Sequence, residues 1–184
     1  MMNKLNIYLI ENEIYIKEKN ISFIDLPIDK KGYILDENTI KLALEPFLNN
    51  SIINFYFFTS KMKIKKLSKE NKFVDFLYIK NYKKYSIDSK KYYVYKKTYK
   101  NIDYSLLLCV PKDYISIWID LFENMNLKIN IITDLLSSFE EYKEFYIKTY
   151  FFEYIFDKSH IYKLKLNKKI NDNLEHNLFL EEIL

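Results

Sequence analysis

The chain has 184 residues and a formal net charge of +4, and 49% of its residues are apolar. This composition is typical of a globular protein with one sizeable core or two small lobes, and it excludes a disordered chain. Glycine occurs once, proline three times, and all 29 basic residues are lysine, a pattern that adenine- and thymine-rich codons produce. Because 25 acidic residues are mixed among the lysines, the charge implies no strong long-range field.

Several kinds of catalytic site are excluded by what the sequence lacks. Phosphate-binding loops need glycines, because the backbone must approach the phosphate closely at positive φ, and Gly32 is the only glycine. One cysteine and two histidines are too few and too scattered for a zinc site. No pair of carboxylates stands out as a catalytic pair. We therefore expect no catalytic residue, no cofactor and no metal, and a protein that is not an enzyme.

The compartment is indicated by the cysteine and by the apolar stretches. Cys109 lies inside the apolar run LLLCV, where we expect a thiol that packs in the core, as suits a reducing compartment. The start, MMNKLNIYLIENE, is too short and too soon interrupted by charge for a signal peptide. No apolar stretch approaches the roughly 20 residues of a membrane helix. We expect a cytoplasmic protein.

The first third of the chain predicts a meander of strands followed by a helix. Alternating apolar residues in LNIYLI, EIYIKEK and NISFIDL predict three strands. After a turn around Gly32, Asp36 is expected to cap a helix over residues 36–48. Pro46 lies late in this helix, so we expect its final turn to be distorted or already ended.

The middle third predicts a strand-rich region that contains two further helices. SIINFYFFTS is apolar on both faces, as expected of a central strand. Ser68 is expected to cap a helix over residues 68–81, and Pro111 is expected in the first turn of a helix whose buried face includes Trp118. Further strands are predicted in KMKIKKL, KKYYVYKKTYK, YSLLLCV and LKINIITD.

The last third predicts a helix followed by a hairpin. SSFEEYKEFYIK has the spacing of an amphipathic helix, and TYFFEYIF and HIYKLKL predict two paired strands. The last dozen residues are expected to form a short helix or a tail. Taken together, the elements predict an α+β fold class.

One segment suggests a binding surface. Residues 78–100, YIKNYKKYSIDSKKYYVYKKTYK, interleave tyrosines with lysines around a single acid, Asp88. Aromatic rings that stack on bases, together with lysines that meet phosphates, are typical of single-stranded nucleic-acid binding. The same residues would also suit anionic lipid headgroups, or an edge strand whose lysines prevent aggregation. The residue pattern leaves these alternatives open.

The order of elements over residues 20–140 resembles the type IV pilus assembly protein PilM, a family of the actin-like ATPase superfamily that also includes FtsA. The first part of the resemblance lies in Leu26-Pro27, Gly32, Ile34, Asp36 and Ile40. The second part lies in Val110-Pro111, Lys112, Ile115, Trp118, Leu121-Phe122, Leu127 and Asp134.

The resemblance implies a degenerate, FtsA-like and actin-like lobe with an inserted mixed α/β subdomain of the SHS2 kind. It implies a first actin-like subdomain in residues 1–50, the insert in 51–134, and a helix-plus-hairpin remnant in 135–184. Family members carry glycines in two phosphate hairpins, whereas the matching segments here, Leu9–Asn12 and residues 149–166, contain none. This departure implies that ATP binding has been lost.

The function implied by the resemblance is a non-catalytic cytoplasmic scaffold of a type IV pilus or type II secretion-like machine. The partner implied is a bitopic inner-membrane protein like PilN, whose short cytoplasmic tail would bind a groove or a sheet edge. We expect this contact around Lys91, Tyr92, Tyr95 and Lys96. Homo-oligomerisation and peripheral membrane association stay open. The alternative function is a single-stranded nucleic-acid-binding module that uses residues 78–100.

Overall fold

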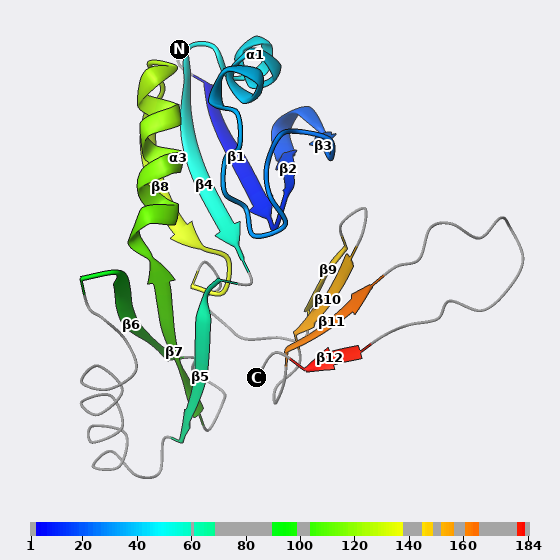
Figure 1. Cartoon of the computed structure of the whole chain (residues 1–184), viewed down its shortest axis with the longest axis vertical. Coiled ribbons are helices and arrows are strands. Elements are labelled where there is room, and N and C mark those ends of the chain that lie inside the picture. The colour runs from blue at the N-terminus through cyan, green and yellow to red at the C-terminus, as the bar shows by residue number, and fades with distance from the viewer. Residues whose placement is uncertain are drawn as a thin grey trace, which may run out of the picture.

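A computed structural model describes residues 3–59, 61–68, 90–98, 104–137, 145–148, 152–156, 161–165 and 180–182. In these ranges the strands form three sheets, and helices α1 and α3 are both connected to the first sheet (Figure 1). This arrangement confirms the predicted α+β fold class. Apart from Ser68, the predicted helix over residues 68–81 lies outside the described residues.

The first sheet has five strands in the order β3-β2-β1-β4-β8. Strands β1, β2 and β3 form the predicted antiparallel meander, whereas β4 pairs parallel to β1 and β8 pairs parallel to β4. The interior position predicted for the apolar strand β4 is thus confirmed. The bounds are β1 Asn3–Ile10, β2 Glu13–Ile16, β3 Ile21–Phe23, β4 Ser51–Phe58 and β8 Lys128–Asp134, with a 3-10 turn at Lys17–Lys19.

Helix α1, Glu37–Leu48, connects the meander to β4. Asp36 caps it as predicted, accepting hydrogen bonds from the backbone N–H groups of Asn38 and Thr39. The helix does not end before Pro46, which was one of the two predicted outcomes, because it continues to Leu48. The carbonyl that loses its donor at Pro46 belongs to Leu42, which is 70% exposed, so water can satisfy it.

Helix α3, Lys112–Asn124, shares the aromatic core with β4. Pro111 is its N-cap, one residue before the predicted position, and it is also the last residue of β7. The ring of Trp118 lies 5.4 Å from that of Phe55 on β4, and the Phe122 ring lies 5.1 Å from the same residue. Trp118 is fully buried, which confirms the expected core role.

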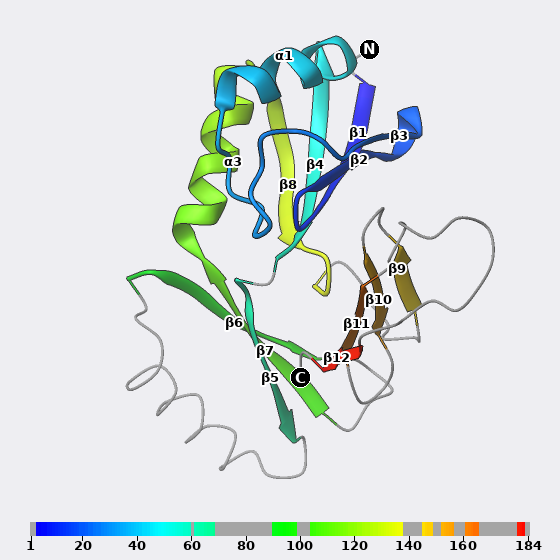
Figure 2. The ribbon, with the colours of Figure 1, turned by 45° about the vertical axis from the view of Figure 1, so that its right-hand side comes forward.

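The second sheet lies between β4 and α3 in the chain and has the antiparallel order β5-β7-β6. Its bounds are β5 Lys63–Ser68, β6 Tyr92–Thr98 and β7 Tyr104–Pro111, and β7 runs directly into α3 (Figure 2). One face, with Leu106, Leu108 and Val110, joins the core of the first sheet. The first sheet contains strands from both sides of residue 50, and the three-part division of the chain stays a prediction.

The third sheet has the antiparallel order β12-β11-β10-β9. The predicted hairpin is confirmed by the pairing of β10 with β11. The prediction of a helix over residues 137–148 was wrong for its last four residues, because Phe145–Lys148 form a strand that pairs with β10. The alternating FYIK sequence suits a strand. The expected terminal helix or tail was also wrong where Leu180–Glu182 pair with β11. The bounds are β9 Phe145–Lys148, β10 Phe152–Phe156, β11 Ile161–Lys165 and β12 Leu180–Glu182.

A row of amide side chains crosses three parallel strands of the first sheet. Asn130 Nδ2 donates to Asn54 Oδ1 at 2.8 Å, and Asn54 Nδ2 donates to Asn6 Oδ1 at 2.8 Å. Asn6 Nδ2 in turn donates to the carboxylate of Glu18. We call these four residues the amide row. The almost fully buried side chain of Asn54 therefore both donates and accepts a hydrogen bond within the row.

The only glycine lies where three segments meet. Gly32 has a φ of +83°, and its carbonyl oxygen accepts a buried hydrogen bond of 2.9 Å from Trp118 Nε1. A Cβ atom at this position would lie 2.8 Å from the carbonyl oxygen of Glu11 and 2.9 Å from Cε2 of Tyr114. The β1–β2 turn, the loop before α1, and α3 are therefore packed together around a position that has no room for a side chain.

We expect Gly32→Ala to lower the free energy of unfolding by about 2 to 4 kcal/mol, because it adds a steric clash to an unfavourable φ. Urea denaturation followed by the fluorescence of Trp118, the only tryptophan, measures the change. The control is Ser22→Ala on exposed β3, for which we expect a change within about 0.5 kcal/mol. Equal stability of the two variants would contradict the packing described here.

Candidate functional site

The four residues expected to bind a partner lie on or next to β6, which is an edge strand among the described residues. Lys91 directly precedes the strand, and its carbonyl oxygen accepts the N–H of Lys112 at 2.9 Å. Tyr92 and Lys96 lie on one face of the sheet, whereas Tyr95 lies on the other, as strand alternation requires. The structure therefore places Tyr95 on the opposite face from Tyr92 and Lys96. Their role in binding stays a prediction.

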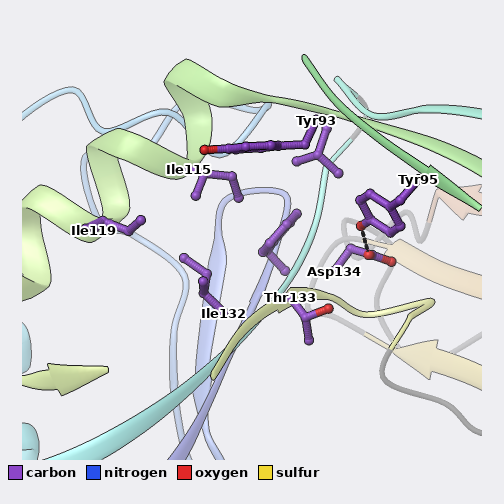
Figure 3. Close-up of a pocket in the computed structure, with 9 residues that line it drawn as sticks. Tyr93, Tyr95, Ile115, Ile119, Ile132, Thr133 and Asp134 are labelled. Atoms are coloured by element: carbon purple, nitrogen blue, oxygen red, sulfur yellow. Dashed lines mark hydrogen bonds between the residues drawn. The ribbon is translucent and has the colours of Figure 1, made fainter. Parts of the chain in front are cut away.

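A groove lies between the second sheet and the first, with a volume of about 370 Å³ (Figure 3). Its apolar walls come from Ile115 and Ile119 on α3 and from Ile132 on β8. Strand β6 contributes Tyr93 and Tyr95. This size falls within the range of about 300–1,000 Å³ that is typical of ligand sites.

One polar pair lines this apolar groove. Tyr95 donates a hydrogen bond from its hydroxyl to the carboxylate of Asp134, which is fully buried (Figure 3). The second oxygen, Asp134 Oδ1, accepts the N–H of Ser137 at 2.8 Å. Burial first, and then the adjacent carboxylate, raises the pKa of Tyr95 above its ordinary value. The pair fixes β6 of the second sheet to the end of β8 in the first.

The rim of the groove is basic on the β6 side. Lys112 Nζ lies 5.1 Å from the centre of the Tyr93 ring, and Tyr93 is 51% exposed. Lys97 Nζ donates to the carbonyl oxygen of Ser137 at 2.9 Å. Among the described strands, β8 pairs with β4 alone and β6 pairs with β7 alone. The groove is thus flanked by two strand edges that could hydrogen-bond to an extended chain.

The β1–β2 turn, where the resemblance would place a phosphate loop, is closed by side chains. Glu11 has a φ of 55° and is 1% exposed, and its N–H donates to Phe58 O at 2.9 Å. Its carbonyl oxygen lies against Gly32, and the fully buried Tyr114 packs at the same place. A carboxylate in this position disfavours a phosphate, and the one available glycine is already part of the packing.

The described part of the lysine- and tyrosine-rich segment does not present open aromatic rings in a row. Lys63 Nζ lies over the Tyr92 ring at 5.0 Å, and Lys112 Nζ lies over the Tyr93 ring. Tyr95 points into the groove. Residues 78–89 and 99–100 of the predicted nucleic-acid surface lie outside the described residues.

The one cysteine, Cys109, has a structural role. Burial raises the pKa of the Cys109 thiol to about 11, and its expected place in the core is confirmed. Within the described ranges, no three histidine, cysteine or acidic side chains are grouped to hold a metal ion. Neither described helix is long and apolar enough to cross a lipid bilayer.

The residues that line the groove were only partly found from the sequence. Tyr95 was among the residues expected to bind a partner, whereas Ile115 and Asp134 belonged to the family resemblance and were not assigned to a groove. Nothing in the local pattern joins Tyr95 to a carboxylate 39 positions away. A signal was nevertheless present, because Asp134 ends an apolar strand, and a buried acid at such a position requires a donor.

No family model matches the chain, and no curated protein sequence matches it significantly. The structure is similar to the cytoplasmic domain of EpsL, an inner-membrane component of the type II secretion system of Vibrio cholerae. The TM-score is 0.54 at 8% identity, covering 94% of this chain and 79% of that domain. This likeness shows a shared fold.

A weaker likeness is to a protein from Bacteroides thetaiotaomicron, which has an actin-like ATPase fold and an unknown function. Its TM-score is 0.39 at 11% identity, covering 88% of this chain and 65% of the other. A likeness at this level supports no inference.

We expect Tyr95→Phe to lower the free energy of unfolding by about 1 to 3 kcal/mol, because it removes the hydrogen bond to Oδ2 of the buried Asp134 carboxylate. Adding Asp134→Asn should restore part of the loss, because the uncompensated charge disappears. Urea denaturation of the two single variants and the double variant measures the coupling. Additive effects would contradict a direct interaction between the two side chains.

The same pair predicts a loss of stability in alkali. The pKa of Tyr95 is raised above the ordinary 10.0, so the folded state holds this proton more tightly than the unfolded state does. The stabilisation is therefore complete below about pH 10 and is lost as the pH rises above that value. Urea denaturation at about pH 8 and about pH 11 should show a smaller pH-dependent loss for Tyr95→Phe than for the wild type. Identical losses would contradict the assignment.

Proposed function

We propose that the chain is a non-catalytic scaffold component of a type II secretion or type IV pilus-like machine. It binds, in the groove between the two sheets, the cytoplasmic tail of a bitopic inner-membrane protein of the PilN kind. The fold shared with the cytoplasmic domain of EpsL supports the class of machine. The family resemblance of residues 20–140 supports a PilM-like position in it, at the inner face of the membrane.

The groove is the observation that carries the binding role. An extended peptide could place apolar side chains between Ile115, Ile119 and Ile132. Its backbone could hydrogen-bond to the edge of β6 or β8, a mode of recognition that needs no catalytic residue. The ammonium group of Lys112 at the rim favours a tail that carries an acidic residue beside its apolar ones.

The loss of nucleotide binding is supported by the β1–β2 turn. The residue in that turn is the buried Glu11, where a phosphate loop would have a glycine. Gly32 is enclosed by neighbouring atoms, so no phosphate can approach its backbone. We expect calorimetry with ATP and magnesium to detect no binding. Dissociation constants in the micromolar range would contradict this half of the proposal.

Tail binding is tested with synthetic fluorescent peptides that cover the cytoplasmic tails of bitopic membrane proteins encoded beside this gene. We expect one peptide to bind, and we expect Tyr93→Ala with Ile119→Ala to weaken it about tenfold or more, since both side chains line the groove. Fluorescence anisotropy measures the affinity.

The matched control removes two exposed apolar side chains away from the groove. Leu35 and Leu42 are each 70% exposed, and the double variant Leu35→Ala with Leu42→Ala should bind as the wild type does. Equal weakening by both double variants, or binding of no tail at all, would contradict the proposed site.

A further inference from the structure

We propose that a second surface, next to the groove, binds anionic phospholipid headgroups. It is formed by six lysines at the junction of the two sheets, which we call the lysine cluster: Lys30, Lys31, Lys61, Lys63, Lys91 and Lys112. The contact with lipid does not depend on the proposed tail binding.

Hydrogen bonds and ring contacts bring the members of the cluster together from four segments. Thr59 Oγ1 donates to the carbonyl oxygen of Lys31 at 2.6 Å and accepts the N–H of Lys61 at 3.2 Å, which joins the loop before α1 to the start of β5. Lys63 Nζ lies 5.0 Å from the Tyr92 ring, next to Lys91. Lys91 is in turn bonded through its carbonyl oxygen to the N–H of Lys112.

Tyr33 connects the loop of Lys30 and Lys31 to the start of α3, next to Lys112. Its hydroxyl lies 3.3 Å from both carboxylate oxygens of Asp113. The side chains of Lys30, Lys31, Lys61, Lys63 and Lys91 are exposed, and that of Lys112 is half-buried.

Little negative charge opposes these ammonium groups. The carboxylate of Asp29 accepts the backbone N–H groups of Lys31 and Tyr33, at 2.8 and 2.9 Å. The carboxylate of Asp113 interacts with Tyr33 and accepts the N–H of Tyr114. Among the described residues, the two acids next to these lysines in sequence are thus bonded to neutral groups.

The local charge differs from that of the rest of the chain. Residues 61–68, 90–98 and 104–112 contain nine lysines and no acid, and the remaining 20 lysines are outnumbered by the 25 acidic residues. Codon usage that favours lysine acts on the whole chain and does not remove aspartate and glutamate from one sheet. The described part of the second sheet therefore carries an excess of positive charge.

The details of the cluster favour a lipid surface over a nucleic acid. Tyr92 and Tyr93 are consecutive in β6 and lie on opposite faces of the second sheet, each with an ammonium group over its ring, so they do not form a continuous row for stacking bases. Mobile lysine charges near an anionic leaflet attract without any fixed geometry.

The cluster and the groove share Lys112 and Tyr93. Lys112 belongs to the cluster, and its ammonium group covers Tyr93, which lines the groove. A membrane held against the cluster would therefore lie beside the mouth of the groove. A tail emerging from that membrane would meet its binding site within a short distance.

The test is co-sedimentation of the full chain with large unilamellar vesicles. One set contains phosphatidylcholine alone, and the other contains about 40% phosphatidylglycerol. We expect binding to the second set only, at about 50 mM salt, and its loss at about 300 mM, because salt screens exposed charges. Binding to both sets, or to neither, would overturn the proposal.

The cluster is assigned by two triple variants that change the net charge equally. Lys30→Glu with Lys31→Glu and Lys61→Glu should reduce the bound fraction at least about fivefold. The control changes three exposed lysines elsewhere, Lys17→Glu with Lys19→Glu and Lys128→Glu, and should reduce it less than about twofold. Equal reduction by both variants would overturn the site, and circular dichroism checks that both fold.

Two further measurements separate this proposal from the others. Tighter binding to a single-stranded oligonucleotide than to anionic vesicles, at the same salt, would overturn the choice of lipid. The cluster variant leaves the groove unchanged, so it should bind a tail peptide in solution as the wild type does. Lipid binding and tail binding can therefore fail independently.

Discussion

The hydrogen bond from Trp118 to the carbonyl oxygen of Gly32 holds together the parts on which the rest of the structure depends. It joins α3 to the loop before α1, and Gly32 lies at the same time against the β1–β2 turn. With α3 fixed in this position, Trp118 and Phe122 pack on Phe55 of the first sheet. Ile115 and Ile119, at neighbouring positions on the same buried side of the helix, line the groove.

The same contact explains why the one glycine of the chain is no sign of a nucleotide site. A glycine that binds phosphate must leave its N–H group and the space around it open, whereas Gly32 is enclosed by Glu11 and Tyr114. The N–H of Gly32 is itself used, donating to the carbonyl oxygen of Asp29 at 3.0 Å. The residue therefore serves the fold.

Local patterns in the sequence predicted much of the fold. The alternation of β1–β3, the cap at Asp36 and the buried Trp118 follow from side-chain spacing and short-range hydrogen bonds. The groove could not be predicted in this way, because the Tyr95–Asp134 contact joins two sheets across 39 positions. Strand β9 was missed for a related reason: FYIK fits both a helical and an alternating pattern, and its pairing with β10 decides between them.

The amide row of Glu18, Asn6, Asn54 and Asn130 has a consequence for how the chain finds its fold. Strands β1, β4 and β8 are parallel neighbours that lie far apart along the chain, so no tight turn sets their alignment. A slip by one residue would direct Asn54 to the side of the sheet that packs on α3 and bring Phe55 out to the other side. The hydrogen bonds of the amide row form only in the correct register, so they destabilise misaligned intermediates while the long-range strand pairs form.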